Sequence, residues 1–372
     1  MRSRHFESVD AVLDRIRADV PWNPFLRESK VTYEWVADGS EGRLVPSLAS
    51  PFWSPFLYRG QIQRHSPCIP GVFRSLQFVR HPQKLTPRER AQCFLARVQL
   101  EEFLLALRDH PAVAYARDIG LKMSREALAQ HYGMATDRLD LSQDPEVAGF
   151  FATNVRADDG HWVPINGGTG VLYRLDVSGR YRALQSGELE WIGKQVLPRP
   201  GEQKGWTLRM PLGGDFETLP VDVFTFEQRR ESGQRINEKF GGGERLFPPD
   251  ALAEVAQAIR ESKSVARSLV SRVLALQGCL GHSHRREMDA SVGFFAKEFN
   301  IAVDDREPLS FSPRQRVAAE AQTRYLKEAF LDDVGVRAAR VMQHRLTAAA
   351  RARQSFAPPG AGGEMIDTCS TR

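Results

Sequence analysis

The chain has 372 residues, of which 42% are hydrophobic and 26% charged, and its formal net charge at pH 7 is +5. This composition is typical of a soluble globular protein and excludes a disordered chain or a membrane protein. The mild positive charge permits an acidic ligand, but it does not indicate nucleic-acid binding, because the basic residues are spread along the chain.

The sequence favours a cytoplasmic protein that does not associate with a membrane. No run of about eighteen apolar residues occurs, and the first residues lack the apolar core and cleavage site of a secretory signal. The cysteines are far apart and form no Cys-x-x-Cys pair: Cys68, Cys93, Cys279 and Cys369. We therefore expect reduced cysteines, no disulfide framework and no metal site.

The first predicted element is an amphipathic helix near the N-terminus. Its apolar face carries Val9, Val12, Leu13 and Ile16. Strands are predicted at 31–36 and 56–63, where β-branched and aromatic residues form short runs. A long helix then starts at Thr86, the N-cap, with Pro87 in the first turn and Glu89 completing a capping box, and it ends at Pro111.

Two shorter helices and three strands follow. One helix is capped by Ser124 and stopped by Gly133. The other starts at Asp144, with Pro145 in its first turn. Glycine and proline clusters separate the predicted strands, which cover residues 169–177, 206–210 and 221–227.

The pattern changes after residue 226, where helical segments succeed one another without a convincing strand. They cover residues 226–240, 250–262, 264–278, 286–299, 313–333 and 335–352. The glycine- and proline-rich stretch 239–250 is the expected boundary. The sequence thus predicts an α+β protein: a mixed α/β N-terminal domain (1–243), an all-helical C-terminal part (244–354) and a disordered tail (355–372).

The stretch Tyr58-Arg59-Gly60-Gln61 stands at the end of an apolar run. On a strand, Arg59 and Gln61 share one face while Tyr58 and Gly60 share the other. Arg59 is therefore either a solvated edge residue or an anion-binding residue on a rigid element.

A second polar cluster, His131-Tyr132-Gly133, lies at the predicted end of a helix beside a loop. Gly133 permits a left-handed turn there, and loops on rigid supports often carry binding sites. The alternative is a core tyrosine with a hydrogen-bonded histidine.

Together these stretches resemble the FRG domain family, which is named for an aromatic-Arg-Gly motif. The resemblance covers about residues 50–153, well under half of the chain. It rests on two ordered blocks: Tyr58 to Gln61 with Pro70 and Arg74, then His131-Tyr132-Gly133, Thr136, Leu139-Asp140 and Pro145-x-x-Ala148-x-x-Phe151-Ala152. Asp137, Arg138 and Ser142 depart from the residues usual in the family.

A more distant resemblance is to arginine-type mono-ADP-ribosyltransferases. Arg59 on a first strand, Ser142 before Ala148 and Phe151, and the later Glu188-Leu189-Glu190 keep the order of that family's three motifs. The resemblance implies a small split sheet and NAD as a substrate. Taken together, the two resemblances imply that NAD is held by Tyr58, Arg59, Gly60, Gln61, His131, Tyr132, Thr136, Ser142 and Gln203.

The resemblance implies catalytic roles for Glu190, Glu188 and Arg59. Breaking the nicotinamide–ribose bond builds positive charge on the ribose, and a carboxylate such as Glu190 would stabilise that transition state. Glu188 would orient the acceptor, and Arg59 would hold a phosphate or a ribose oxygen. One alternative is that both glutamates are solvated strand-edge residues. Another is that Gln203 occupies the position of the catalytic carboxylate, which implies weak or absent catalysis.

Three functional hypotheses follow. The first is an NAD-consuming ADP-ribosyltransferase-like protein that needs no metal and modifies a macromolecular acceptor, either protein or nucleic acid. The second is a non-catalytic FRG binding module for a nucleotide, a nucleic acid or a peptide. The third assigns assembly to the helical C-terminal part, although the sequence does not determine an oligomeric state.

Overall fold

The computed structural model describes residues 2–19, 33–46, 55–76, 84–178, 187–278, 281–332 and 336–355. The predicted disordered tail, apart from Ser355, lies outside these ranges. Within them, no helix combines the length and apolar character needed to cross a membrane. The described side chains also include no group of three or more His, Cys, Asp or Glu that could hold a metal ion.

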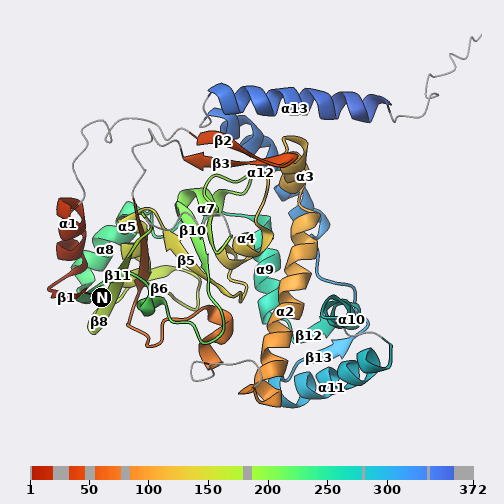
Figure 1. Ribbon diagram of the computed structural model, residues 1–372, viewed down its shortest axis with the longest axis horizontal. Coiled ribbons are helices and arrows are strands. Elements are labelled where there is room, and N and C mark those ends of the chain that lie inside the picture. Colours follow the sequence, from red (N-terminus) through yellow and green to blue (C-terminus); the bar gives the residue numbers. More distant parts are fainter. Residues whose placement is uncertain are drawn as a thin grey trace, which may run out of the picture.

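A seven-stranded mixed sheet organises the N-terminal part (Figure 1). In spatial order its strands are β1 (Arg2–Phe6), β11 (Val221–Glu227), β8 (Thr169–Asp176), β4 (Phe56–Gln61), β5 (Arg138–Ser142), β10 (Gly205–Arg209) and β9 (Leu189–Trp191). Only β1 and β11 are parallel neighbours; the other adjacent pairs are antiparallel. The α+β class is confirmed, but the sheet is continuous rather than split. Its weakest junction is that of β4 and β5, which share the single residue pair Tyr58 and Ser142.

Three helices cover one face of this sheet: α1 (Val9–Asp19), α5 (Pro145–Thr153) and α8 (Arg230–Lys239). The predicted apolar face of α1 is buried as expected. Because α5 crosses directly above β4, a β-carbon added to Gly60 would lie 1.7 Å from the carbonyl oxygen of Ala148. The glycine of the Tyr-Arg-Gly sequence is thus required by the close approach of a helix to a strand.

The predicted helix starts are largely confirmed. Helix α2 (Pro87–Arg108) has the complete capping box of Thr86 and Glu89, and the Asp144 side chain accepts a hydrogen bond from the first turn of α5. Helix α4 (Arg125–His131) differs, because Ser124 makes no capping hydrogen bond. Helix α2 ends at Arg108, before the predicted Pro111, and Pro111 instead begins the next helix, α3 (Pro111–Asp118).

The C-terminal part contains five helices in the described residues: α9 (Ala251–Glu261), α10 (Arg267–Leu276), α11 (Gly281–Phe299), α12 (Pro313–Asp332) and α13 (Val336–Ser355). It is not all-helical, since β12 (Ser264–Ala266) and β13 (Ala302–Asp304) pair in parallel. Each of these strands has three residues. That length is too short for alternation to be distinguished from the helical pattern beside it.

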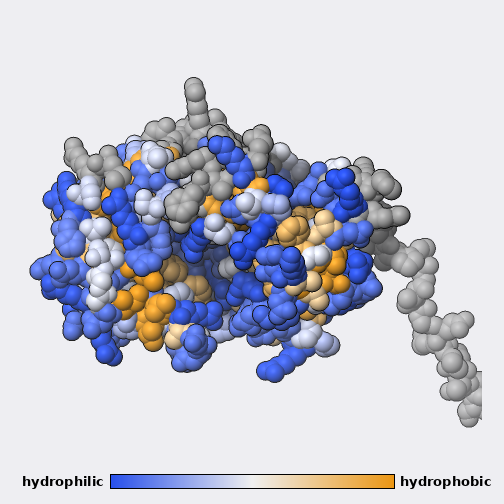
Figure 2. Space-filling model, turned by 90° about the horizontal axis from the view of Figure 1, so that it is seen from below, coloured by the Kyte–Doolittle hydropathy of each residue, from blue (hydrophilic) through white to orange (hydrophobic). Residues whose placement is uncertain are grey.

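Smaller elements complete the fold. They are β2 (Tyr33–Asp38) with β3 (Glu41–Pro46), β6 (Asn154–Arg156) with β7 (Trp162–Pro164), α7 (Pro198–Glu202), and the 3-10 turns η2 (Gly71–Leu76) and η4 (Phe216–Thr218). Seen from below, the surface is largely hydrophilic and its hydrophobic residues lie in separate patches (Figure 2).

The two parts of the chain share a hydrophobic core. One cluster combines residues of α2, α3 and α4 with residues of α9, α12 and α13, including Phe103, Leu128, Leu252 and Phe330. A partly buried ion pair also joins them, since Arg306 donates to both carboxylate oxygens of the buried Glu102 on α2, at 2.7 and 3.2 Å. The stretch 239–250 therefore connects two parts that pack against each other.

Candidate functional site

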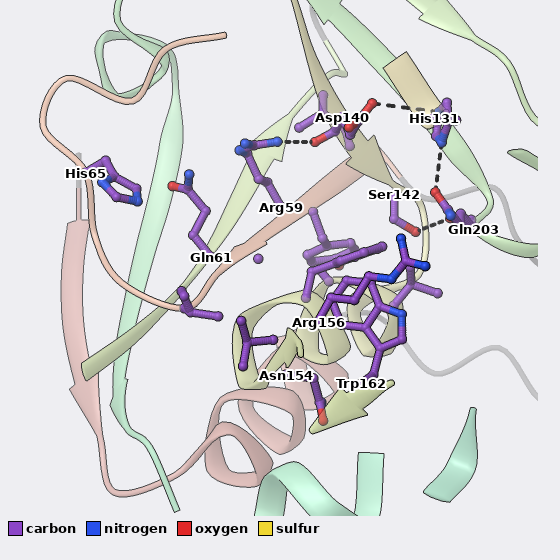
Figure 3. Close-up of a pocket in the computed structure, with 18 of the residues that line it drawn as sticks. Arg59, Gln61, His65, His131, Asp140, Ser142, Asn154, Arg156, Trp162 and Gln203 are labelled. Atoms are coloured by element: carbon purple, nitrogen blue, oxygen red, sulfur yellow. Dashed lines mark hydrogen bonds and ion pairs between the residues drawn. The ribbon is translucent and has the colours of Figure 1, made fainter. Parts of the chain in front are cut away.

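A partly enclosed pocket of about 460 Å³ lies beside the junction of β4 and β5. Its polar lining residues are Arg59 and Gln61 of β4, His65, Arg74 of η2, His131 of α4, Asp140 and Ser142 of β5, Asn154 and Arg156 of β6, and Gln203. Tyr58, Phe151 and Trp162 contribute aromatic surface. Figure 3 shows His65 and Gln61 at the left of this pocket, Arg156 and Trp162 at the lower right, and Asp140 at the top beside His131.

Arg59 occupies the gap where β4 and β5 separate. Its Nη1 donates a hydrogen bond of 2.8 Å to the backbone carbonyl of Asp140 (Figure 3). Its Nε is buried and has no hydrogen-bond partner among the described residues. The arginine is therefore held on rigid strands while donor capacity remains for a ligand.

The positive charges of the pocket act on one another. Burial and the neighbouring charge of Arg59 lower the pKa of Arg74. Burial, Arg74 and Arg59 likewise lower the pKa of His65. A bound anion would relieve this repulsion, because it supplies the opposite charge at the same place.

His131 has a defined orientation and a defined tautomer. Gln203 donates through Nε2 to the carbonyl of Leu246 at 3.0 Å, so its Oε1 faces Nδ1 of His131 at 2.8 Å. An amide oxygen only accepts, and Nδ1 of His131 must therefore carry the hydrogen. Nε2 of His131 then faces Asp140, with 3.8 Å between Nε2 and Oδ1, and neither atom has a hydrogen-bond partner among the described residues.

Ser142 and Thr136 support the pocket wall indirectly. The Ser142 hydroxyl donates to the backbone carbonyl of Gln203 at 2.8 Å and accepts from the Asp144 amide at 3.0 Å. Thr136 donates to Gln130, which in turn donates to the Asp140 carboxylate at 3.1 Å. Neither contact involves Arg59, and Thr136 does not line the pocket.

The pocket does not contain the two glutamates predicted for catalysis. Oε2 of Glu190 accepts from Arg138 at 2.8 Å and from the Ser124 hydroxyl at 2.7 Å, and Oε1 accepts from Arg43 at 3.4 Å. The Glu190 side chain is 11% exposed. Glu188 is solvent-exposed just before β9. The structure thus separates Glu190 from Arg59 by two strands, and the carboxylate that does line the pocket is that of Asp140.

Of the residues predicted to hold a nucleotide, the pocket brings together Tyr58, Arg59, Gly60, Gln61, His131, Ser142 and Gln203. Tyr132 lies behind the wall, and its hydroxyl donates to Asp250. Sequence reasoning did not select His65, Arg156 or Trp162 as site residues. These three carry no sequence pattern of their own and reach the pocket only through the loop after β4 and the β6–β7 hairpin.

Comparison with protein families identifies the part of the chain that forms most of this pocket. Residues 54–160 match the FRG domain model. The chain contains an FRG domain. The predicted resemblance to that family is confirmed, whereas no comparison supports the resemblance to ADP-ribosyltransferases. No curated protein and no solved structure matches the chain.

The FRG domain does not complete its own pocket. Trp162 and Gln203 line the pocket but lie beyond residue 160, and Leu246, which fixes the Gln203 amide, lies further along the chain. The residues after the matched segment therefore decide part of the shape of the site.

Proposed function

We propose that this protein is a binding module whose FRG pocket recognises a nucleotide without performing chemistry on it. One observation carries the proposal: three arginines line the pocket, and none of them forms an ion pair with a carboxylate of a described residue. Arg59 and Arg156 donate to backbone carbonyls instead, and burial and the charge of Arg59 lower the pKa of Arg74. Unpaired guanidinium groups in a concave site are the donors that phosphate oxygens require.

The aromatic lining supports a nucleotide over a simple phosphate. Phe151 and Trp162 line the pocket together, and their ring centroids lie 6.0 Å apart. Aromatic side chains present flat surfaces on which bases stack. The volume of about 460 Å³ lies in the range of small-molecule sites, which makes room for a base, a sugar and phosphates.

The transferase hypothesis finds less support in the same geometry. It requires a carboxylate facing the ribose, and Glu190 is engaged by Arg138, Arg43 and Ser124 outside the pocket. Gln203 lies in the pocket wall, but an amide supplies no charge to a developing cation. A macromolecular acceptor belongs to that hypothesis and is not part of this proposal.

The proposal is tested by calorimetric titration of the full chain with ADP, NAD and inorganic pyrophosphate, and by assaying nicotinamide release from NAD. We expect saturable binding of ADP or NAD, weaker binding of pyrophosphate, and no nicotinamide release. Failure of all three ligands to bind would contradict the proposal, and stoichiometric or catalytic nicotinamide release would replace it with the transferase hypothesis.

Replacing Glu190 by glutamine separates the two hypotheses further. The change leaves the buried guanidinium of Arg138 without its carboxylate, so we expect a loss of stability of about 3 kcal/mol or more. Nucleotide affinity, measured well below the melting temperature, should stay within about twofold of wild type because Glu190 does not touch the pocket. A large loss of affinity at unchanged stability would indicate that Glu190 faces the ligand.

A further inference from the structure

The segment that starts the C-terminal part lies directly behind the pocket wall. Residues 240–250 connect α8 to α9, and the carbonyl of Leu246 in this segment accepts the hydrogen bond from Gln203 that sets the amide orientation. Gln203 in turn orients His131. One backbone carbonyl after the FRG domain therefore determines how two polar residues face the ligand.

The same segment supports the aromatic side of the pocket. Phe247 stacks on Trp162, with ring centroids 5.0 Å apart and planes inclined by 20°, and also meets Phe151 edge-on at 5.9 Å. Gly243 has a positive φ of 93°, and a β-carbon there would lie 2.4 Å from the Trp162 ring. Trp162 is thus fixed between its own hairpin and the segment that follows α8.

A third connection joins the turn after α4 to α9. The Tyr132 hydroxyl donates to Oδ2 of Asp250, while Oδ1 of Asp250 caps α9 by accepting from the Leu252 amide at 2.8 Å. Burial and the Asp250 carboxylate raise the pKa of Tyr132, so its hydroxyl stays protonated and donates. Arg260, near the other end of α9, donates to the Tyr132 carbonyl at 2.5 Å.

From these contacts we infer that Leu246, Phe247 and Asp250 are positioning residues for the pocket, and that docking of α9 and nucleotide binding stabilise each other. The nature of the ligand rests on the proposed function. The positioning of the pocket wall by Leu246, Phe247 and Asp250 applies to the ligand-free protein as well. Coupling between two sites is reciprocal. A change that loosens the docking of α9 therefore lowers the affinity for the ligand, and bound ligand in turn stabilises the docked position of α9.

Asp250→Asn is the sharpest test. Asparagine keeps the N-cap of α9, but its Nδ2 cannot accept, so the hydrogen bond from the Tyr132 hydroxyl to a carboxylate is lost and at most a weaker neutral one, donated by Nδ2, replaces it. Tyr132→Phe removes the same hydrogen bond from the other side and keeps the ring that packs on Phe103 and Arg199. Glu254→Gln is the matched control, because it neutralises a carboxylate on α9 that contacts Gln315 of α12 and not the pocket wall.

The first measurement is hydrogen–deuterium exchange of the ligand-free full chain. We expect faster exchange at the amides of residues 201–205 in Asp250→Asn and Tyr132→Phe than in Glu254→Gln, although these amides do not touch Asp250. Equal exchange in all three variants would overturn the inference, whether or not any nucleotide binds.

The second measurement uses ADP. We expect both test variants to bind ADP about five- to tenfold more weakly than Glu254→Gln, and we expect ADP to slow exchange in α9 of the wild-type chain. Unchanged affinity and unchanged exchange in α9, in a protein that binds ADP, would overturn the coupling and leave the proposed function standing. Absence of ADP binding in wild type would instead count against the proposed function. The exchange data alone would then decide whether the contacts with α9 position the residues of the pocket wall.

Discussion

Gly60→Ala is expected to destabilise this protein more than the addition of a methyl group at any other position of the seven-stranded sheet. The new β-carbon would lie 1.7 Å from the carbonyl oxygen of Ala148 and 2.9 Å from the amide nitrogen of Ala152. Both are backbone atoms of α5, so no side-chain rotation can relieve the clash. Either α5 moves away from β4 or the strand shifts, and both movements disturb the buried cluster that includes Tyr58 and Phe150.

We expect Gly60→Ala to lower the free energy of unfolding by about 3 kcal/mol or more, measured as a shift of the urea midpoint. Gly71→Ala is the matched control, because its β-carbon would meet no atom within 4 Å and Gly71 has no positive φ. A melting temperature of Gly60→Ala within about 2 °C of that of Gly71→Ala would show that α5 does not approach β4 this closely.

The largest expected effect on binding comes from Arg59→Ala. Hydrogen bonds between a guanidinium and a phosphate contribute about 1.5–3 kcal/mol each, so we expect ADP affinity to fall roughly 10- to 100-fold. The same substitution removes the hydrogen bond to the Asp140 carbonyl and should cost about 1 kcal/mol of stability. Affinity must therefore be measured by calorimetry at a temperature at which the variant is folded.

Two further variants make the Arg59 result specific. Arg59→Lys keeps the charge but loses the planar pair of donors, and we expect it to recover only a part of the affinity. Arg64→Ala removes a nearby arginine that pairs with Glu217 and does not line the pocket, so it should bind ADP as wild type does. Similar losses in Arg59→Ala and Arg64→Ala would mean that general positive charge, and not the pocket, attracts the ligand.

Local patterns in the sequence determined much of the fold. The capping box of Thr86 and Glu89, the Asp144 cap and the apolar face of α1 were predicted correctly, because each depends on residues no more than four positions apart. The exception among the predicted caps is explained by a residue that is distant in the sequence. Ser124 has the residue type of an N-cap, but its hydroxyl is used by Glu190, which lies 66 positions away in the chain.

Other elements could not be predicted because their partners are distant in sequence. Strand β1 exists through its parallel pairing with β11, more than two hundred residues later. The short strands β12 and β13 pair only because α10 and α11 bring them together. Sequence periodicity contains no signal for such pairings, since each strand alone is too short to show one.

The residues of the candidate site also fall into those that the sequence predicted and those that only the tertiary structure revealed. By itself the sequence determined the two blocks of the FRG domain, with Tyr58, Arg59, Gly60 and His131 as site residues, and it offered Gln203 separately, outside those blocks. The tertiary structure alone decided that Glu190 is held by Arg138 and Arg43 outside the pocket. It also decided that Trp162 lines the pocket and that the Leu246 carbonyl holds the Gln203 amide from behind the wall. The physical reason is that residue type sets which interactions a side chain can make, whereas the charges and surfaces it meets are set by segments that only folding brings within a few ångströms.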